Sequence, residues 1–467
     1  MTRQRMTYIE VLDESPMTPF LWLLLIGVSL AQIFDGIDLQ STAYALPVII
    51  RELKITPAQA GVIPAATNFG LLAGALVFAV LSDRLGRKGV FQAVIGFYAI
   101  GSLLSALAPT YQLLLPARVI TGFGLGAEFP VAFALLAEYA PTRQRHRFIP
   151  LGPLTNSLGY WLAGLLAVWI IPHFGWRAMY WLGVTPALII LYIRRYIPES
   201  VRYLLARGEV EEAGRIARHM ADRAGFAEVE LVPPEPVQGA KQTPAGLLRT
   251  TLPTLIALSL LYFCFYIQST GFQSWLPTIF VQQGFTLVRS FTFALIVGIA
   301  GMVAMVFAGW VQERIPRKYA LVTQSTIGAC FFIGAGLAFQ FHMAIGIVVA
   351  AFFLTQLFVV GINAILFTMG SELFPTPVRS MGMGIVTGVG RSGAILGPLI
   401  LGFYLTFGTQ ISQIIYLFSI PLVVASLVAV FLVRVDSRQK TLEMIEQASF
   451  SGPEFALGTP GAAASAG

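Results

Sequence analysis

The chain alternates between long hydrophobic runs and short polar links that hold charged residues, proline and glycine. Each run provides about 20 apolar residues, the length that a helix needs to cross the hydrocarbon core of a bilayer. The pattern therefore predicts an all-α integral membrane protein with twelve transmembrane helices. The predicted spans cover residues 20–48, 58–81, 89–108, 112–138, 148–171, 176–197, 252–280, 290–311, 320–340, 343–370, 381–405 and 411–433.

Two segments depart from this pattern. Residues 198–250 contain PESVRYLLARGEVEEAGRIARHMADR, whose spacing of apolar residues predicts an amphipathic helix, followed by the proline-rich PPEP. From Val435 the chain runs to GTPGAAASAG, a composition typical of disorder. We therefore expect a six-helix bundle over 1–197, a cytoplasmic linker over 198–250, a second six-helix bundle over 251–435 and a disordered cytoplasmic tail over 436–467.

The chain repeats itself. AVLSDRLGRK at 79–88 matches GWVQERIPRK at 309–318 with an offset of 230, and EYAPTRQR matches ELFPTPVR with an offset of 234. Two motifs at nearly the same offset indicate a duplication, so we expect two pseudo-symmetric bundles. Parallel halves of this kind hold their substrate between them, near the middle of the membrane.

Composition agrees with a lipid environment. Hydrophobic residues make up 56% of the chain and charged residues 11%, whereas a soluble domain carries roughly a quarter charged residues. The two cysteines, Cys264 and Cys330, lie inside apolar runs, so no disulfide framework is expected.

The placement of positive charge predicts the orientation. With both termini inside, the outer links and helix ends hold only four of the 30 Lys and Arg residues, namely Arg51, Lys54, Arg177 and Arg289. Arg118 and Arg391 lie within spans, which leaves 24 on the cytoplasmic side. We expect a monomeric, multi-pass protein of the inner or plasma membrane with both termini in the cytoplasm. Its net charge of +7 then reflects topology and not nucleic-acid binding.

Asp35 and Asp38 in the first span share one helix face, because they are three residues apart. A carboxylate inside the membrane costs about 3 kcal/mol and therefore needs a function or a partner. At 1.5 Å per residue, Asp38 lies about 14 Å and Arg118 about 10 Å below the outer surface, so their depths nearly match. We predict that one aspartate holds Arg118 while the other binds a proton. The alternative is a purely structural pair.

Glu128 is a third acid within a span, about 15 Å from the inner surface. Its counterpart in the second half is Ile362, so the acid belongs to one half only and is predicted to take part in proton coupling. The alternative is a protonated carboxyl that is hydrogen-bonded within the bundle.

Arg391 is the corresponding cation of the second half, about 15 Å from the cytoplasmic end of its span. Its counterpart, Ser157, is uncharged. A guanidinium near the midplane can bind a carboxylate through two parallel hydrogen bonds, so Arg391 is predicted to bind the substrate. The alternative is a permanent pair with Glu128 or with a helix end.

Aromatic and amide side chains gather where the substrate should lie, and ring stacking with a few amide donors suits a planar organic acid. Each of them can equally be a packing or lipid-facing residue. With Arg118, the further candidate substrate contacts are Tyr44, Asn156, Tyr160, Tyr266, Gln268, Gln273 and Asn363. The glycines Gly122, Gly124 and Gly126 are expected to allow close contact between helices.

Several of these motifs resemble the major facilitator superfamily. Asp83, Arg84, Gly86, Arg87 and Lys88 match its signature G-x-x-x-D-R-x-G-R-R, with Ala79 in place of the first glycine. FDGIDLQSTAYALP resembles the D-G-x-D signature of the aromatic acid–proton symporters. GFGLGAEFPVAFALLAEYAPTRQR, ELFPTPVRSMGMG and GVGRSGAILGP are similar to the same group, and the resemblance covers residues 20–435.

The resemblance implies that the repeated motifs form a conformational latch that closes the cytoplasmic side. Asp83 would accept hydrogen bonds at the end of a neighbouring helix and pair with arginine, and Gly86 would permit a tight turn. The alternative is topology alone, since any cytoplasmic link gathers basic residues. The latch residues are Asp83, Arg84, Gly86, Arg87, Glu138 and Arg145 in the first half, and Glu313, Arg314, Arg317, Glu372 and Arg379 in the second.

These features predict a proton-coupled symporter of a small aromatic carboxylate that works by alternating access. A sugar, polyol or organic-ion carrier stays open because of Gln268 and of PESVRYLL, which resembles other branches. A membrane sensor that does not transport is a further alternative, and drug efflux is a weaker one. The four histidines lack metal-ligand spacing and no P-loop occurs, so we expect no enzyme and no cofactor.

Overall fold

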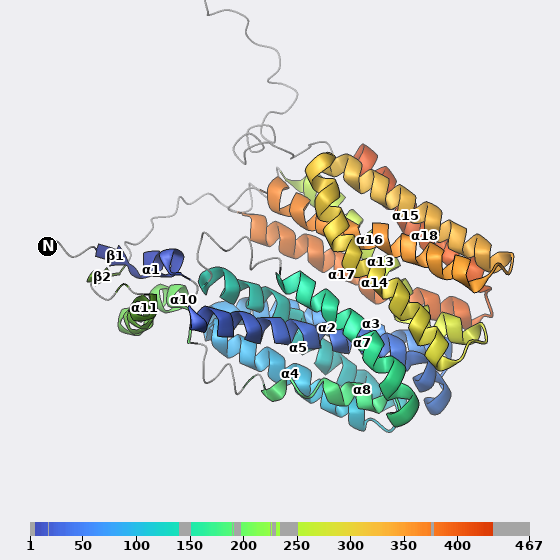
Figure 1. Cartoon of the computed structure of the whole chain (residues 1–467), viewed down its shortest axis with the longest axis horizontal. Coiled ribbons are helices and arrows are strands. Elements are labelled where there is room, and N and C mark those ends of the chain that lie inside the picture. Colours follow the sequence, from blue (N-terminus) through green and yellow to red (C-terminus); the bar gives the residue numbers. More distant parts are fainter. Residues whose placement is uncertain are drawn as a thin grey trace, which may run out of the picture.

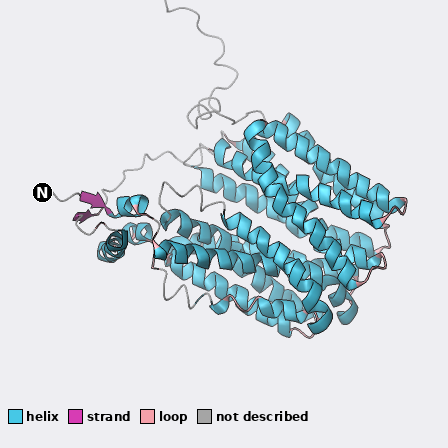
Figure 2. Cartoon of the chain, viewed as in Figure 1, coloured by secondary structure: helices cyan, strands magenta, loops and turns pink. Residues whose placement is uncertain are grey.

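The computed structural model is almost entirely helical (Figure 2). It describes residues 5–16, 18–139, 151–188, 190, 198–224, 226, 230–233, 251–374 and 378–432. Side chains are described for these residues except Phe20, Asp83, Phe129, residues 133–138, Leu151, Pro153, Glu230 and Ser380. The predicted disordered tail over 436–467 lies outside this part of the chain.

Long helices follow one another with short links. In the first half they are α2 (Pro19–Leu53), α3 (Pro57–Leu85), α4 (Arg87–Leu107), α5 (Tyr111–Tyr139), α7 (Leu151–Phe174) and the short α8 (Arg177–Leu182). In the second half they are α13 (Leu252–Gln282), α14 (Leu287–Arg314), α15 (Arg317–Gln340), α16 (Ile345–Leu373), α17 (Arg379–Thr406) and α18 (Ile411–Phe431).

The described residues include 10 helices that are long and apolar enough to cross a membrane. A further helix, α5, has 29 residues and coincides with the fourth predicted span. The sixth predicted span, 176–197, begins with α8, and most of its last third lies outside the described residues. The all-α membrane fold is therefore confirmed, and the sixth of the twelve spans is seen only in part.

Thr-Pro pairs begin two of the helices. Thr56 Oγ1 accepts a hydrogen bond from the N–H of Gln59 at 3.2 Å, and Gln59 Oε1 accepts one from the N–H of Thr56 at 2.9 Å. This capping box satisfies amide groups that the first turn of α3 would leave unpaired, while Pro57 has no N–H that needs an acceptor there. Thr18 caps α2 in front of Pro19 by accepting a hydrogen bond from the N–H of Leu21 at 3.4 Å, without the reciprocal bond.

The two halves pack alike. α2 contacts α7 as α13 contacts α17, α3 contacts α5 as α14 contacts α16, and α4 contacts α5 as α15 contacts α16. Figure 1 shows α2 to α8 lying together below α13 to α18. The repeat in the sequence is thus a repeat in the packing.

Glycines set the closest of these contacts. A Cβ on Gly124 would approach the backbone of Tyr98 in α4, and one on Gly122 or Gly126 would collide with the backbone of α3. Only glycine lets the helix axes come this close. The predicted role of the three glycines in helix packing is confirmed.

The halves are joined at the end of the molecule that holds the α2–α3 turn, which we term the turn end. One apolar core there combines residues of both halves, including Tyr44, Phe280 and Phe291. The N–H of Ala58 also donates to Thr406 Oγ1 at 2.8 Å across the two halves. Toward the opposite end, the linker end, the two apolar cores each draw on one half and its attachments only.

A small module lies at the linker end (Figure 1). It contains α1 (Tyr8–Glu14), α10 (Val201–Ala206) and α11 (Val210–Ala224), and α1 packs against α11. Where the sequence predicted one amphipathic helix, the structure has two, α10 and α11, separated at Gly208. The strands β1 (Arg5–Thr7) and β2 (Glu230–Val232) pair in parallel, which the hydrophobic pattern did not predict.

Candidate functional site

A buried ion pair between Asp38 of α2 and Arg118 of α5 occupies the centre of the first half. Arg118 Nη2 donates to Asp38 Oδ1 at 2.7 Å, and both side chains have 0% exposure. Ser102 of α4 donates to the second oxygen, Oδ2, at 2.7 Å. Both oxygens of Asp38 are thus satisfied, as a buried carboxylate requires. The pairing predicted from the matching depths is confirmed.

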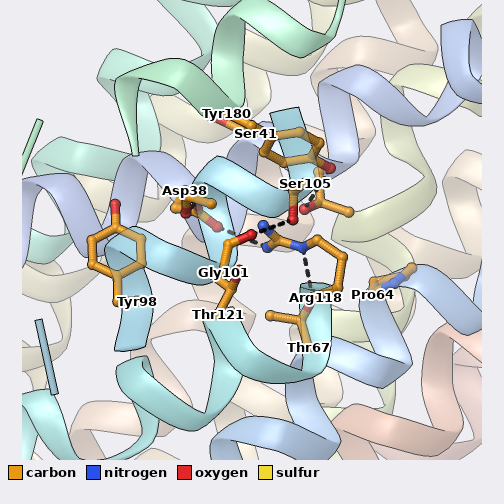
Figure 3. Close-up of polar contacts among 12 residues, drawn as sticks. Asp38, Ser41, Pro64, Thr67, Tyr98, Gly101, Ser105, Arg118, Thr121 and Tyr180 are labelled. Carbon is orange, nitrogen blue, oxygen red and sulfur yellow. Dashed lines mark hydrogen bonds and ion pairs between the residues drawn. The ribbon is translucent and has the colours of Figure 1, made fainter. Parts of the chain in front are cut away.

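Arg118 also contacts two other elements (Figure 3). Its Nε donates to Thr67 Oγ1 of α3 at 3.1 Å, and its guanidinium carbon lies 4.8 Å from the ring centre of Tyr180 in α8. The Tyr180 hydroxyl in turn shares a hydrogen bond of 3.3 Å with Thr42. Asp38, Thr67, Ser102, Arg118 and Tyr180 therefore tie five segments together, and we call them the Arg118 clamp.

Asp35 lies one turn before Asp38 in a different environment. It is 5% exposed, and Asn156 of α7 donates to its Oδ2 at 3.3 Å. Its Oδ1 has no hydrogen-bond partner among the residues that the structure describes. Arg391 of α17, in the other half, is close enough for electrostatic interaction with it. Asp35 is thus a buried carboxyl with spare hydrogen-bonding capacity that faces the second half.

Glu128 is the least satisfied of the acids. It is 1% exposed, and within the described part of the chain neither carboxyl oxygen has a hydrogen-bond partner. Asp35 and Tyr98 are within electrostatic range. The alternative in which Glu128 pairs permanently with Arg391 is not seen among these residues.

Arg391 is half-buried on α17 at the interface between the halves. It interacts electrostatically with Asp35 and with Tyr160 of α7. Its guanidinium makes no hydrogen bond or ion pair with any residue in the described ranges. The ring of Tyr266 from α13 lies beside Gly390, where a Cβ would come within 3.1 Å of Tyr266 Cδ2. Arg391 therefore lies within electrostatic range of the Asp35 carboxyl and the Tyr160 phenol, and its donors have no partner among the described residues.

The other predicted substrate contacts lie in different places. Tyr44 is 2% exposed and packs edge to face on Phe291 at 5.4 Å, in the core that joins the halves. Gln268 is 1% exposed, and its Oε1 has no partner within the described residues. Gln273 and Asn363 are half-buried on α13 and α16. Of the predicted contacts, Asn156 donates a hydrogen bond to Asp35, and Tyr160 lies within electrostatic range of Asp35, Tyr266 and Arg391.

The latch region of the first half is built on a residue that the sequence analysis did not select. Glu199 Oε1 accepts hydrogen bonds from the N–H groups of Arg87 at 2.9 Å and Lys88 at 3.1 Å. A carboxylate at a helix N-terminus satisfies free amides and interacts favourably with the helix dipole. Gly86 precedes this helix with φ of 87°, a value that favours glycine.

The linker also binds the end of α3. The carbonyl of Arg84 accepts a hydrogen bond of 2.9 Å from the Tyr203 hydroxyl of α10. The side chains of Asp83 and Glu138, and all of Arg145, lie outside the described residues. The predicted pairing of Asp83 with an arginine therefore stays a prediction.

In the second half the latch residues contact one another. Arg317 donates to both oxygens of Glu372, at 2.8 and 3.3 Å, and to the carbonyl of Gln312 at 2.8 Å. This joins the link after α14 to the end of α16. Arg379 donates to the carbonyl of Phe374 at 3.3 Å. The nitrogen–oxygen distance between Arg314 and Glu313 is 3.7 Å on an exposed surface.

Gln32 is another residue that the sequence analysis did not select. It has 0% exposure, and its side-chain oxygen and nitrogen have no partner within the described chain. Its backbone carbonyl accepts from Asn156 at 3.2 Å. The spacing of three residues from Gln32 to Asp35 and from Asp35 to Asp38 places all three on one helix face and was a readable signal.

Two helix bundles with equivalent packing, buried charges and a polar cluster between them define a membrane transporter of the duplicated-bundle type. The chain belongs to the family described as sugar (and other) transporter, whose model matches residues 31–448, and hence to the major facilitator superfamily. It is a transporter and not an enzyme.

Similar proteins include the niacin transporter of Acinetobacter baylyi, which is 32% identical over 447 residues, 94% of this chain and 100% of that protein. The gallate transporter of Pseudomonas putida is 30% identical and covers 89% of this chain and 92% of its own length. Among solved structures, a D-xylose–proton symporter aligns with a TM-score of 0.73 and 18% identity over 90% of this chain and 100% of that one, which shows the fold alone.

Proposed function

We propose that this protein transports a small aromatic carboxylate together with protons, by alternating access between the two halves. Its relatives include transporters named for niacin and gallate, which are carboxylic acids on aromatic rings. The benzoate transport protein of Acinetobacter baylyi is similar as well, at 28% identity over 91% of this chain and 92% of that protein. The shared substrate chemistry is a carboxylate on a planar ring.

The observation that carries this proposal is Arg391. Its guanidinium lies between the halves without a hydrogen-bond partner among the described residues, so its donors can bind an acceptor that enters from outside the protein. A carboxylate matches its planar fork with two parallel hydrogen bonds. The phenol of Tyr160 lies within electrostatic range of Arg391 and of Tyr266, and such rings suit the faces of an aromatic substrate.

Proton coupling is supported by the acids of the first half. Asp35, Asp38 and Glu128 are buried in one bundle, and acids within a membrane commonly belong to proton pathways. A proton gradient is a sufficient source of energy for this fold. Alternating access requires only that the loaded and the empty protein can each change between the outward-facing and inward-facing conformations.

The excess of positive charge at the linker end supports a cytoplasmic location of both termini in the inner or plasma membrane. The cores are continuous between the halves at the turn end and separate at the linker end. In this orientation the described conformation is closed outside and corresponds to the inward-facing state.

Binding of an acid and its amide tests the substrate site. Benzoate should bind wild type, and Arg391→Lys should weaken binding because lysine keeps the charge but lacks the planar fork; the whole charge-assisted pair is worth about 2–3 kcal/mol, so the loss should not exceed roughly 30- to 150-fold. Benzamide should bind weakly to both proteins, with little change. The control is Arg289→Lys, an exposed arginine at the turn end.

Equal losses for benzoate and benzamide would mean that Arg391 is structural. Uptake into proteoliposomes with an inward proton gradient tests transport itself, with benzoate, nicotinate, gallate and D-xylose compared. Accumulation of xylose and of none of the acids would refute the proposed substrate class.

A further inference from the structure

Asn156 of α7 bridges two successive turns of α2. Its Nδ2 donates to the backbone carbonyl of Gln32 at 3.2 Å and to Oδ2 of Asp35 at 3.3 Å. An asparagine amide has two N–H groups, and these two acceptors engage both of them. The nitrogen of Asn156 therefore has no donor left for a substrate, and its hydrogen bonds lie within the first half.

Two glycines bring α7 this close to α2. A Cβ on Gly36 would lie 2.3 Å from the backbone oxygen of Asn156, and one on Gly159 would lie 2.2 Å from the backbone oxygen of Ile33. Any larger residue at either position would push the two helices apart. The contact between these glycines therefore sets the distance over which the Asn156 side chain reaches Asp35.

The carbonyl of Gln32 fixes the orientation of the Asn156 amide. A carbonyl oxygen can only accept a hydrogen bond, so the amide must present its nitrogen there. The same nitrogen donates to Asp35 Oδ2, while Oδ1 of Asp35 has no hydrogen-bond partner among the residues that the structure describes. The two oxygens of Asp35 are therefore not equivalent, since one faces a donor and the other does not.

We infer that Asn156 is a positioning residue for Asp35: it holds Oδ2 as an acceptor, so that the proton which Asp35 carries under the proposed function binds to Oδ1. A protonated carboxyl has one O–H donor and one carbonyl acceptor. With the proton on Oδ1, Oδ2 is the carbonyl oxygen and keeps its hydrogen bond from Asn156. A proton on Oδ2 would face the amide N–H and that hydrogen bond would be lost. The inference rests on the proton coupling in the proposed function.

The other groups near Asp35 act on it by charge and not by hydrogen bonds. The titratable and charged side chains within electrostatic range of it are Asp38 of α2, Tyr98 of α4, Glu128 of α5, Tyr160 of α7 and Arg391 of α17. Among the described residues, Asn156 is the side chain that donates a hydrogen bond to Asp35. The charged groups thus affect how readily Asp35 gains a proton, and Asn156 determines which oxygen receives it.

Infrared difference spectra of the purified full chain at low and high pH test the inference. Each carboxyl that takes up a proton contributes a C=O stretch, and the band that is missing in Asp35→Asn belongs to Asp35. A hydrogen bond to the carbonyl oxygen weakens the C=O bond and lowers the frequency of this stretch. Asn156→Leu has a similar size and no donor, so it should move the Asp35 band to higher wavenumber.

The pH midpoint of the band is a second readout. A donor stabilises a carboxylate more than it stabilises the neutral acid, so its loss in Asn156→Leu should move the midpoint upward, by up to about one pH unit. Asn156→Ser, whose hydroxyl is too short to reach both acceptors, should move the band and the midpoint in the same directions. It serves as the test if Asn156→Leu does not fold.

Two matched controls separate this role from a general effect on the bundle. Gly159→Ala leaves Asn156 in place but separates α7 from α2, so it should shift the Asp35 band as Asn156→Leu does. Gly298→Ala adds a Cβ that meets no atom within 4 Å and should leave the band unchanged. Asn68→Leu removes a half-buried amide of the same half, which donates to the carbonyl of Pro64 at 2.9 Å, and should also leave it unchanged.

Each contrary outcome has a distinct meaning. An Asp35 band that stays in place in both Asn156 variants overturns the inference and leaves the proposed function intact. The same holds if Asn68→Leu shifts the band equally, or if Asn156→Leu weakens benzoate binding at every pH without moving the band. If no band depends on Asp35, this residue takes up no proton, so its proposed part in proton coupling fails and the inference fails with it.

Discussion

The Arg118 clamp predicts a large energetic coupling between Asp38 and Arg118. Both side chains have 0% exposure and the ion pair has a nitrogen–oxygen distance of 2.7 Å. Removing one member of such a pair leaves a buried charge without compensation, at about 3–5 kcal/mol. We therefore expect Asp38→Asn and Arg118→Met each to lower the free energy of unfolding by about that amount.

The double variant should lower the free energy of unfolding by much less than the sum of the two single variants, because it removes both charges. The methionine side chain is also apolar and of a length similar to that of arginine. A coupling energy of about 3 kcal/mol or more is expected from the cycle. Equilibrium unfolding in detergent can be followed by the fluorescence of the seven tryptophans.

The pair of Arg317 and Glu372 provides the control. Its nitrogen–oxygen distance of 2.8 Å is similar, but the side chains are 17% and 26% exposed. Solvent screens such a pair, so the same cycle there should give a coupling of about 1 kcal/mol or less. If Asp38→Asn unfolds like wild type and instead abolishes proton-driven accumulation, Asp38 is the titrating acid and this reasoning is wrong.

Two further predictions concern the linker end. Glu199→Ala should lower the free energy of unfolding by about 1 kcal/mol, because two amides of α4 lose their cap. Glu199→Gln should recover part of this loss. Equal stability of wild type and both variants would contradict the capping role of Glu199. In a Cys330→Ser background, Glu211→Cys on α11 should react with a membrane-impermeant maleimide in inside-out vesicles and not in right-side-out ones. Labelling in right-side-out vesicles would reverse the proposed orientation.

The sequence was sufficient for features that depend on period, length and repetition. The hydrophobic runs predicted the long helices, and the fixed rise of a helix predicted that Asp38 and Arg118 meet. The three glycines of α5 predicted close helix contacts: Gly122 and Gly126 leave room for α3 on one face, and Gly124 leaves room for α4 on the other. In each case the prediction followed from the fixed rise and period of a single helix.

Other features depend on how distant segments dock, which period and length do not describe. Glu199 accepts a hydrogen bond from the N–H of Arg87, which is 112 positions away in the sequence. The amphipathic pattern that follows Glu199 indicated that this segment packs against a surface, but not which surface. The strands β1 and β2 have three residues each, too few for an alternating pattern. The approach of Asp35 to Arg391 depends on the relative position of two bundles that the repeat relates only in sequence.

The duplication makes the exceptions to symmetry informative. Asp35 and Glu128 belong to the first half and Arg391 to the second, and at the offset of 234 Glu128 and Arg391 correspond to Ile362 and Ser157. A charge needed for packing would be expected in both halves, as the acidic and basic residues of the repeated links are. Here the acids of the first half and Arg391 of the second half carry opposite charges. The electrostatic attraction between the halves therefore depends on the charge of any ligand or proton bound between them. Under the proposed function, a substrate carboxylate at Arg391 or a proton on one of the buried acids would change that attraction, so the distribution of charge would link occupancy of the site to the movement of one half against the other.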